Sequence, residues 1–379
     1  MENSQIIIKE VKTLKELKQF INFEYNLYKN NKYWVPPLFD DEFKTLRKDK
    51  NPAFDHCEAV YYTAWKNGKM VGRIAGIIQH NYIKKWGNKY ARINWFDFID
   101  DFEVSKTLLN KVESWAKEKG MIAINGPLGF TDLDYEGLLI EGFEELNTMA
   151  TIYNYPYYIE HYEKLGFKKD ADWVEFEIKV PEKIPEKADK LSRIVAERFK
   201  LHLFQAKSVK EILDKGYGKQ IFEVIEKAYV NLYGVTELTP KQVDYYIKAY
   251  FSFINLDFLK LVANEKEEIV GLVIAMPSLN RALQKAKGKL FPFGFIHLLY
   301  ALKKPKYIDL LLGAILPEYQ GKGVDALIMT ELTRTCIKDG IISAESNPEL
   351  EVNEKVQSHW KYFNARQHKR RRAFLKMID

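Results

Sequence analysis

The order of apolar and polar stretches along the chain predicts two α/β units built on one plan. In the first half, apolar strands at 60–65 and 70–78 flank the turn sequence Asn67-Gly68, a pattern that is typical of a β-hairpin. The second half has a matching pair of strands at 258–263 and 269–274, and a Val-Gly pair stands near the start of the second strand in both hairpins. This recurrence indicates an internal repeat.

A strand–helix–strand segment follows each hairpin. The expected elements are 93–98, 104–119 and 121–124 in the first half, and 308–315, 325–338 and 341–344 in the second half. Gly120 and Gly340 follow the two helices, and apolar side chains recur at helical spacing along one face of the first helix. Parallel strands need a crossover of about this length. We therefore expect an α/β fold in which each half is a mixed β-sheet flanked by helices.

A charged stretch with two prolines, Pro181 to Lys187, separates the halves. Proline resists both the helix interior and the central strand, so this stretch predicts a linker. The expected divisions are a first domain at 1–180, its insertion at 127–152, a linker at 181–190, a second domain at 191–379 and its insertion at 277–306.

Composition and charge narrow the class of protein. Of the 379 residues, 46% are hydrophobic and 29% charged, as expected for a globular protein rather than a disordered one. Two cysteines are too few for a disulfide scaffold, and the first residues lack the pattern of a signal peptide, so we expect a cytoplasmic protein. Residues 361–379, with seven Lys or Arg and one Asp, account for the whole net charge of +6. This basic end can contact phosphates, anionic lipid or nucleic acid, or form a solvated strand or helix end.

The segment Gln320-Gly321-Lys322-Gly323 joins an expected strand to an expected helix. Glycines let backbone N–H groups converge, and the helix N-terminus adds positive potential, so the segment predicts a cradle for a pyrophosphate. Pro317 cannot donate a ladder hydrogen bond, so the strand is expected to part from its neighbour there. A plain turn that caps the helix is the structural alternative. A dinucleotide site formed with Glu345 is excluded, because the 34 residues that follow are too few for further crossover units.

Residues 317–323, Pro-Glu-Tyr-Gln-Gly-Lys-Gly, resemble the acyl-CoA loop of the GNAT superfamily of N-acyltransferases. Residues 162–167, Tyr-Glu-Lys-Leu-Gly-Phe, resemble the closing motif of the same superfamily, in which the tyrosine often protonates the leaving thiolate. The repeated topology is also that of a tandem GNAT protein. The resemblance implies an acyl-CoA loop at 315–326, with cofactor contacts from Ile315, Leu316, Gln320, Gly321, Lys322, Gly323, Val324, Asp325 and Ala326.

The chain departs from this pattern in ways that divide the roles between the halves. In the second half, Asp325 stands where the loop has Gly or Ala, and Trp360 stands where the tyrosine is expected. A carboxylate beside a pyrophosphate is repulsive unless it points away, and an indole cannot act as the acid. In the first half the corresponding loop, 99–104, is acidic and lacks glycine. We infer that the second half binds the acyl thioester and that the first half contributes acceptor contacts.

Acyl transfer needs few groups beyond a bound thioester. An amine attacks the thioester directly, a base removes its proton, and backbone N–H groups near Ile315 and Leu316 stabilise the oxyanion. The candidate base is Glu345, at the C-terminal end of a strand next to the cofactor strand, with Asp309 as a second candidate. Tyr162 is the candidate acid for the thiolate. The structural alternatives are a turn-capping Glu345 and a Tyr162 packed in the core.

The favoured function is therefore N-acyl transfer from acyl-CoA, or from the pantetheine of an acyl-carrier protein, to a small-molecule or lipid amine. An apolar segment at 290–302, followed by Lys303-Lys304, suits a long acyl chain, peripheral contact with a bilayer, or core packing between the halves. We expect no metal, because no histidine pair has ligand spacing on one helix and the acidic loop at 129–137 lacks the glutamate of a calcium loop. The alternatives are a non-catalytic binding protein and an anionic-surface binder that uses residues 368–372, with nucleic acid disfavoured as a partner.

Overall fold

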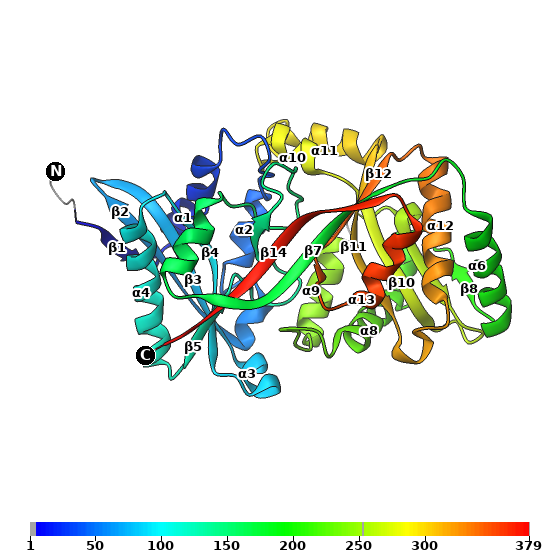
Figure 1. The fold of residues 1–379 in the computed structure, drawn as a ribbon, viewed down its shortest axis with the longest axis horizontal. Helices are drawn as coiled ribbons and strands as arrows, with labels where there is room; N and C mark the ends of the chain where they lie inside the picture. Colours follow the sequence, from blue (N-terminus) through cyan, green and yellow to red (C-terminus); the bar gives the residue numbers. More distant parts are fainter. Residues whose placement is uncertain (1–4, 252–253, 379) are drawn as a thin grey trace. The chain divides into compact units, whose positions relative to one another are not determined.

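A computed structural model describes residues 5–251 and 254–378 of the chain (Figure 1). The chain forms two compact units. Unit 1 contains the residues up to Val174 together with Asn280–Leu298 and the C-terminal residues from His368. Unit 2 contains Glu175–Leu279 and Leu299–Gln367.

The elements of unit 1 come mainly from the first half of the chain. Its strands are β1 (Ile7–Glu10), β2 (Cys57–Lys66), β3 (Lys69–Gln79), β4 (Tyr90–Phe98), β5 (Ala123–Gly126) and β6 (Leu138–Glu141). Its helices are α1 (Leu14–Leu27), α2 (Phe39–Thr45), α3 (His80–Trp86), α4 (Phe102–Glu118), α5 (Tyr157–Lys164) and α10 (Asn280–Ala286). Elements with residues in both units are β7 (Lys168–Lys179), α11 (Gly294–Lys303) and β14 (Ala365–Met377).

The elements of unit 2 come from the second half. Its strands are β8 (His202–Phe204), β9 (Leu259–Ala263), β10 (Ile269–Pro277), β11 (Tyr307–Ile315), β12 (Ser343–Ser346) and β13 (Glu349–Leu350). Its helices are α6 (Glu186–Phe199), α7 (Val209–Asp214), α8 (Tyr217–Tyr229), α9 (Pro240–Tyr250), α12 (Val324–Lys338) and α13 (Glu354–Gln357). Short 3₁₀ turns lie at Pro52–Asp55 in unit 1 and at Leu256–Phe258, Pro317–Tyr319 and Ser358–Tyr362 in unit 2.

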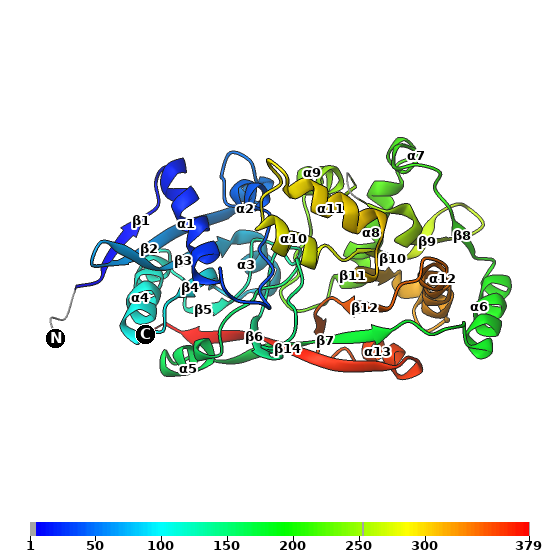
Figure 2. The ribbon, with the colours of Figure 1, turned by 90° about the horizontal axis from the view of Figure 1, so that it is seen from above.

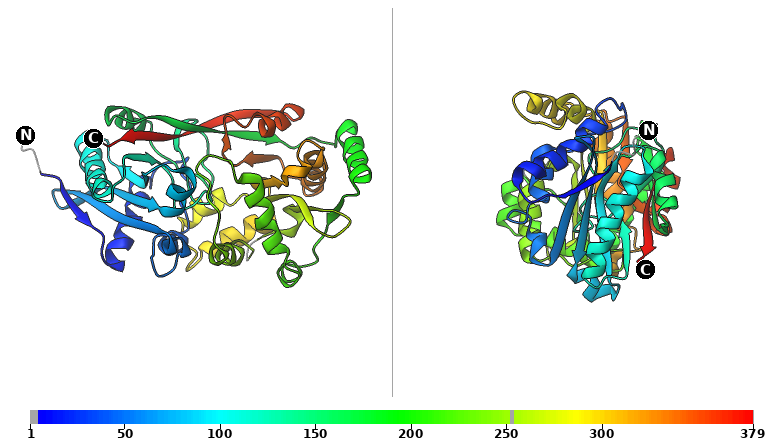
Figure 3. Two further views of the ribbon diagram at one scale, coloured as in Figure 1. Left: turned by 90° about the horizontal axis from the view of Figure 1, so that it is seen from below. Right: turned by 90° about the vertical axis from the view of Figure 1, so that its left-hand side faces the viewer.

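Unit 1 is built on a mixed sheet with the strand order β1-β2-β3-β4-β5-β14. Neighbouring strands are antiparallel except β4 and β5, which are parallel and joined by α4. The hairpin of β2 and β3 turns at Asn67 and Gly68, whose φ angles of 52° and 74° are those that an Asn-Gly turn requires. α4 packs on β2 and β3 (Figure 3). Its buried face contains Leu108, Val112 and Ala116.

Unit 2 repeats this plan in a sheet with the strand order β7-β12-β11-β10-β9-β8. β11 and β12 are parallel and joined by α12, and the other neighbours are antiparallel. α12 packs against α6 and against β9 and β10 (Figure 2). Ile308, Leu310 and Ala344 from the sheet join Ile328 and Leu332 from α12 in one core. The expected α/β class, with a mixed sheet in each half, is confirmed.

The division into units differs from the sequence expectation at two segments. Residues 280–298, inside the expected second domain, belong to unit 1, where the Asn280 side chain accepts a hydrogen bond from the Met149 N–H. The residues from His368 onward also belong to unit 1, because β14 pairs with β5 and β6. A strand from the far end of the chain therefore completes the unit 1 sheet, and nothing in its own sequence indicates its partner.

The basic C-terminal end is part of this strand. Asp172, itself buried, binds Arg372 at 2.7 Å and Arg370 at 3.2 Å. Arg371 is fully buried and donates to the Asn147 side-chain oxygen at 2.9 Å. The three arginines are thus engaged inside unit 1. The alternative of an anionic-surface binder that uses this stretch loses its physical basis, because the charges are already neutralised or hydrogen-bonded.

Three further observations bear on the expected chemistry and location. Within residues 5–251 and 254–378, no group of three or more His, Cys, Asp or Glu side chains is placed to hold a metal ion. Asp134 of the acidic loop accepts hydrogen bonds from the N–H groups of Phe130 and Thr131, so it folds the loop onto itself. The helices of the described chain are all too short or too polar to cross a membrane.

Candidate functional site

In unit 2, the parallel strands β11 and β12 part from each other near the middle of β11. Their ladder ends at Leu310 and Ser346. Asn347 closes it, with its N–H on the Leu310 carbonyl and its side-chain amide on the Leu311 carbonyl. The register between β10 and β11 also shifts at Leu311. Among the described residues, the rest of β11 has no strand partner on this edge.

The separated part of β11 presents backbone groups to this gap. The Leu316 N–H donates to the Val270 carbonyl on β10 at 2.9 Å. Because antiparallel pairing alternates along a strand, the N–H groups of Gly313 and Ile315 point away from β10 and into the gap. The Gly313 carbonyl accepts from the Tyr229 hydroxyl at 2.9 Å. The expected oxyanion role is therefore compatible with Ile315, whereas that of Leu316 is corrected, because its N–H belongs to the ladder.

The glycine loop follows the turn Pro317–Tyr319. Gly321 and Gly323 have φ angles of 71° and 82°, in the left-handed region that glycine adopts without strain. Gly323 directly precedes α12, and a Cβ atom there would lie 2.8 Å from the Val195 side chain on α6. Backbone conformation and close packing thus both require glycine at Gly323, whereas Gly321 has open space around it.

The predicted cofactor contacts lie together on this loop. Gln320, Gly321 and Lys322 are exposed, Ile315, Leu316, Gly323, Asp325 and Ala326 are half-buried, and Val324 is buried. The Gln320 side chain donates to the Ile315 carbonyl at 3.0 Å and so holds the loop against the end of β11. Lys322 lies over the rings of Phe199 and Tyr319. The arrangement presents glycine backbone and one lysine at the N-terminus of α12.

Asp325 occupies the first turn of α12. Its carboxylate lies 2.9 Å from Nε2 of His359. The hydrogen bond from His359 holds the pKa of Asp325 below its usual value, and the N–H groups of Asp325 and Ala326 add to this effect. The carboxylate is therefore directed to His359 and also lies at the helix N-terminus, the place that favours an anion. A phosphate bound here would compete with it.

Three carboxylates stand in register across the sheet of unit 2. Asp309 is opposite Glu345, and Glu345 is opposite Glu177. Residues in register share a face, and here it is the face opposite to the one packed on α12. Arg366 binds Glu177 at 2.7 Å, while Asp309 is buried and Glu345 half-buried. The predicted bases Glu345 and Asp309 are thus neighbours on one face.

Glu349, a carboxylate that the sequence analysis did not single out, is the first residue of β13. The indole Nε1 of Trp360 donates to its two carboxylate oxygens at 2.9 and 3.1 Å. Burial raises the pKa of Glu349 to about 7. A base with a pKa near neutrality is matched to proton abstraction at physiological pH. Trp360, at the place of the expected tyrosine, therefore serves as the hydrogen-bond donor that orients Glu349.

Tyr162 lies in the core of unit 1. It is fully buried, and its ring contacts those of Phe96, Phe167 and Phe374. No partner for its hydroxyl is found in the described part of the chain, and burial raises its pKa. These surroundings are those of a packed core tyrosine. They give no support to its expected role as the thiolate acid.

The end of β4, which corresponds in unit 1 to the separated part of β11, is closed. The Tyr157 hydroxyl donates to the Phe98 carbonyl at 2.5 Å, and the Tyr158 hydroxyl accepts from the Phe98 N–H at 3.1 Å. His161, also on α5, lies 3.1 Å from Asp100 in the acidic loop. Side chains of α5 therefore occupy the backbone N–H and carbonyl groups of Phe98 at the end of β4.

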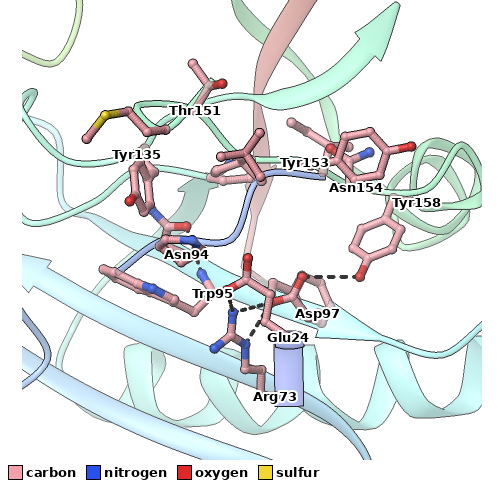
Figure 4. A pocket seen from close by; sticks show the side chains of 17 residues that line it. Glu24, Arg73, Asn94, Trp95, Asp97, Tyr135, Thr151, Tyr153, Asn154 and Tyr158 are labelled. Atoms are coloured by element: carbon pink, nitrogen blue, oxygen red, sulfur yellow. Dashed lines mark hydrogen bonds and ion pairs between the residues drawn. The ribbon is translucent and has the colours of Figure 1, made fainter. Parts of the chain in front are cut away.

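Unit 1 instead has a pocket at an irregularity of β4 (Figure 4). Trp95 adopts a φ of 45° where β4 shifts its register against β3. Arg73 lies between Glu24 and Asp97, at 2.7 and 2.6 Å (Figure 4). Further aromatic and amide side chains line the pocket, namely Asn94, Tyr135, Tyr153, Asn154 and Tyr158. Its cavity volume is about 40 Å³, enough for two or three water molecules.

The pocket holds one guanidinium against two carboxylates. Burial raises the pKa of Glu24, and the charge of Arg73 opposes that rise. Beside it, burial raises the pKa of Glu42 to about 8, and Trp95 Nε1 donates to this carboxyl at 2.6 Å. The two carboxyl groups that face one guanidinium, together with the aromatic lining, suit a small cationic group. The pocket joins distant positions in the sequence, so no local motif could have indicated it.

Two known proteins are similar to this chain in sequence over most of its length. Protein YghO of Escherichia coli (strain K12) is 26% identical over 370 residues, which cover 96% of this chain and 93% of that protein. Bacterial ceramide synthase of Caulobacter vibrioides (strain NA1000 / CB15N) is 27% identical over 305 residues, which cover 79% of this chain and 77% of that protein. No protein-family model matches the chain.

A solved structure is similar to this chain in fold. It is described as a tandem GNAT protein from the clavulanic acid biosynthesis pathway, without AcCoA. It superposes over 99% of this chain and 99% of its own, with a TM-score of 0.57 and 10% sequence identity. The likeness at this identity concerns the fold, and it extends over both units. The chain therefore has the fold of a tandem GNAT protein, with two such units.

Proposed function

We propose that the protein is an N-acyltransferase that moves an acyl group from a CoA thioester to the amine of a lipid-like acceptor. The observation that carries the proposal is the free edge of β11 in unit 2, next to the glycine loop that opens α12. A CoA thioester has a pyrophosphate, which suits a helix N-terminus, and a carbonyl, which needs N–H donors in the transition state. One strand–loop–helix segment supplies both the helix N-terminus and the N–H donors.

In the proposed reaction, the neutral amine attacks the thioester carbonyl carbon and forms a C–N bond. The N–H groups of Gly313 and Ile315 stabilise the oxyanion, whose collapse breaks the C–S bond. Glu349 or Glu345 takes the proton that the nitrogen loses. The Tyr229 hydroxyl, which lies at the gap, protonates the leaving thiolate and regains its proton from solvent. The products are an amide and CoA.

The proposal of a lipid-like amine as the acceptor is supported by the name of one relative and by the pocket of unit 1. One relative is named bacterial ceramide synthase, and ceramide is the amide of a long-chain amine. The pocket, with Arg73 against Glu24 and Asp97, suits the ammonium head of such an amine. Glu24→Gln is expected to raise the KM for a long-chain amine about tenfold and to leave CoA binding unchanged. An unchanged KM would remove the pocket from the proposal.

Calorimetric titration with CoA, acetyl-CoA and palmitoyl-CoA tests the donor site. We expect micromolar binding by the wild-type protein, and binding about tenfold weaker for Lys322→Glu, because an acid then faces the phosphates. Lys355→Glu, a change at an exposed lysine outside the loop, is the matched control. Wild-type protein that binds none of the three ligands would exclude CoA as the donor. An acyl-carrier protein would then be titrated in the same way.

A non-catalytic binding protein is the second candidate, and Asp325 favours it. The Asp325 carboxylate already lies at the helix N-terminus, where it competes with a phosphate. An assay for free CoA thiol separates the two functions. The enzyme releases thiol from palmitoyl-CoA when a long-chain amine such as sphinganine is added. A binding protein takes up palmitoyl-CoA and releases no thiol with any amine.

A further inference from the structure

The segment around α11 exposes an unusual set of large apolar side chains. Phe291, Phe293, Ile296, Leu299 and Tyr300 are 76%, 71%, 50%, 58% and 66% exposed. Leu298 is the buried residue of α11, and Ala301 and Leu302 are half-buried, while the other large apolar side chains of this helix are exposed. Contiguous apolar patches of this kind mark interaction surfaces.

Basic side chains flank this apolar set on both sides. Residues 269–308 contain seven Lys or Arg and no Asp or Glu. The lysines next to the patch are Lys285, Lys287 and Lys289 before it and Lys303, Lys304 and Lys306 after it, and all six are exposed. Lys304 also lies over the ring of Tyr300. The segment thus combines an exposed apolar centre with a positive rim.

We propose that residues 285–306 form a docking surface for an anionic lipid bilayer. α11 has ten residues, far fewer than the roughly 20 that a membrane span needs. It therefore lies in the interface, with Phe291, Phe293 and Leu299 among the acyl chains and the lysines at the level of the headgroups. Each lysine near an anionic leaflet strengthens the electrostatic attraction to the membrane. The aromatic groups add a hydrophobic contribution to the binding free energy, which salt does not screen.

Charge complementarity selects the bilayer over other occupants. A second copy of this chain would bring seven like charges against seven and would be repelled. A nucleic acid would neutralise the lysines and leave the phenylalanines in water. An anionic bilayer satisfies both parts of the surface. The proposal goes beyond acyl transfer, and its test uses no substrate, so it can fail while the proposed function stands.

Flotation of the full-length protein with vesicles tests the proposal. The vesicles are phosphatidylcholine alone, and phosphatidylcholine mixed with phosphatidylglycerol. We expect at least about tenfold tighter binding to the anionic vesicles. The double variant Phe291→Asp, Phe293→Asp is expected to lose at least about tenfold of this binding. Val352→Asp, at a side chain that is 79% exposed outside the segment, is the matched control and keeps it.

A second pair of variants separates local charge from net charge. Lys303→Glu with Lys304→Glu is expected to weaken anionic binding about tenfold or more. Lys106→Glu with Lys248→Glu changes the net charge equally at exposed lysines elsewhere, and it is expected to have much less effect. Equal losses in the two pairs would overturn the proposed surface, because binding would then follow overall charge alone.

Insertion has its own readout. The variant Tyr300→Trp is expected to gain a blue-shifted emission, relative to wild type, when anionic vesicles are added, because the indole leaves water. An unshifted emission overturns insertion. Wild-type protein that binds neither kind of vesicle overturns the proposal as a whole. The proposal is also overturned if light scattering shows a wild-type dimer that Phe291→Asp converts to a monomer while flotation stays unchanged. A second copy of the chain would then be the occupant of this surface.

Discussion

At the scale of single residues, the carboxylate of Asp325 in the first turn of α12 lies where the proposed donor would place a phosphate. Asp325 is held by His359 at 2.9 Å and lies at the positive end of the helix. Both side chains of the pair are half-buried, so the pair contributes at most about 1 kcal/mol to stability. The carboxylate is therefore expected to affect the affinity for a phosphate ligand more than the stability of the fold.

Asp325→Asn is expected to tighten CoA binding about three- to tenfold, because it removes a negative charge beside the phosphates. Calorimetry at low and high salt measures this, and the gain is expected to shrink as salt screens the interaction. Asp339→Asn, at the opposite end of α12, makes the same chemical change and is expected to leave affinity unaltered. Weaker binding by Asp325→Asn would show that the carboxylate is itself part of the ligand site.

Glu349 makes the stability of the protein depend on pH. Burial raises its pKa from 4.5 to about 7 in the folded protein, so between these values the folded state binds more protons than the unfolded state. The stabilisation is full below pH 4.5 and is lost as the pH rises through 7, by an amount on the order of 2–3 kcal/mol. Glu349→Gln keeps an acceptor for Trp360 and cannot ionise.

We therefore expect Glu349→Gln to match the wild type in urea unfolding at pH 5 and to be more stable at pH 8, by about 1–3 kcal/mol. Glu354→Gln, at an exposed carboxylate nearby, is the control and is expected to show no such divergence. Equal pH profiles for wild type and Glu349→Gln would mean that Glu349 is solvated in solution. They would also withdraw it as the proposed base.

At the scale of elements, α5 and the end of β4 decide that the two units differ. The Phe98 N–H is buried and bonded to Tyr158, whose hydroxyl also lies 2.9 Å from the hydroxyl of Tyr28. Tyr158→Phe leaves that N–H without a partner, so we expect a loss of about 1–3 kcal/mol in the free energy of unfolding. Tyr157→Phe, on the half-buried neighbour, is expected to cost less.

Both tyrosine variants are expected to bind CoA as the wild type does, because the proposed site lies on β11 and α12. Calorimetry on the two variants checks this. A fall in CoA affinity for Tyr158→Phe, with the protein still folded by circular dichroism, would place a CoA contact in unit 1. The asymmetry between the units would then have to be explained in another way.

The elements of the fold were predictable where the signal is local. The hairpin at Asn67-Gly68, the crossover through α4 and the loop at Gly321 and Gly323 each follow from turn chemistry or periodicity. The Glu349–Trp360 contact and the Arg73 cluster were not predictable, because burial and long-range pairing create them. Glu349 has an ordinary polar sequence around it, and only the indole reveals its environment.

At the scale of the whole molecule, chain order and spatial order differ. The last strand, β14, pairs with β5 and contributes Phe374 to the core of unit 1. Arg370 and Arg372 from the same strand compensate the buried charge of Asp172. Unit 1 therefore cannot complete its sheet until the residues of β14 have been made.

Truncation after Gln367 is expected to unfold unit 1, because it removes a strand that pairs with β5 and β6, a core phenylalanine and the partners of a buried aspartate. Unit 2 ends at Gln367, so its residues are expected to keep their protection from hydrogen exchange. Hydrogen exchange followed by peptide mass spectrometry distinguishes the units in one experiment. Removal of only the residues after Met377 is the control and is expected to leave both units protected. Persistent protection of β4 and α4 in the longer truncation would show that β14 closes a sheet that is already stable without it.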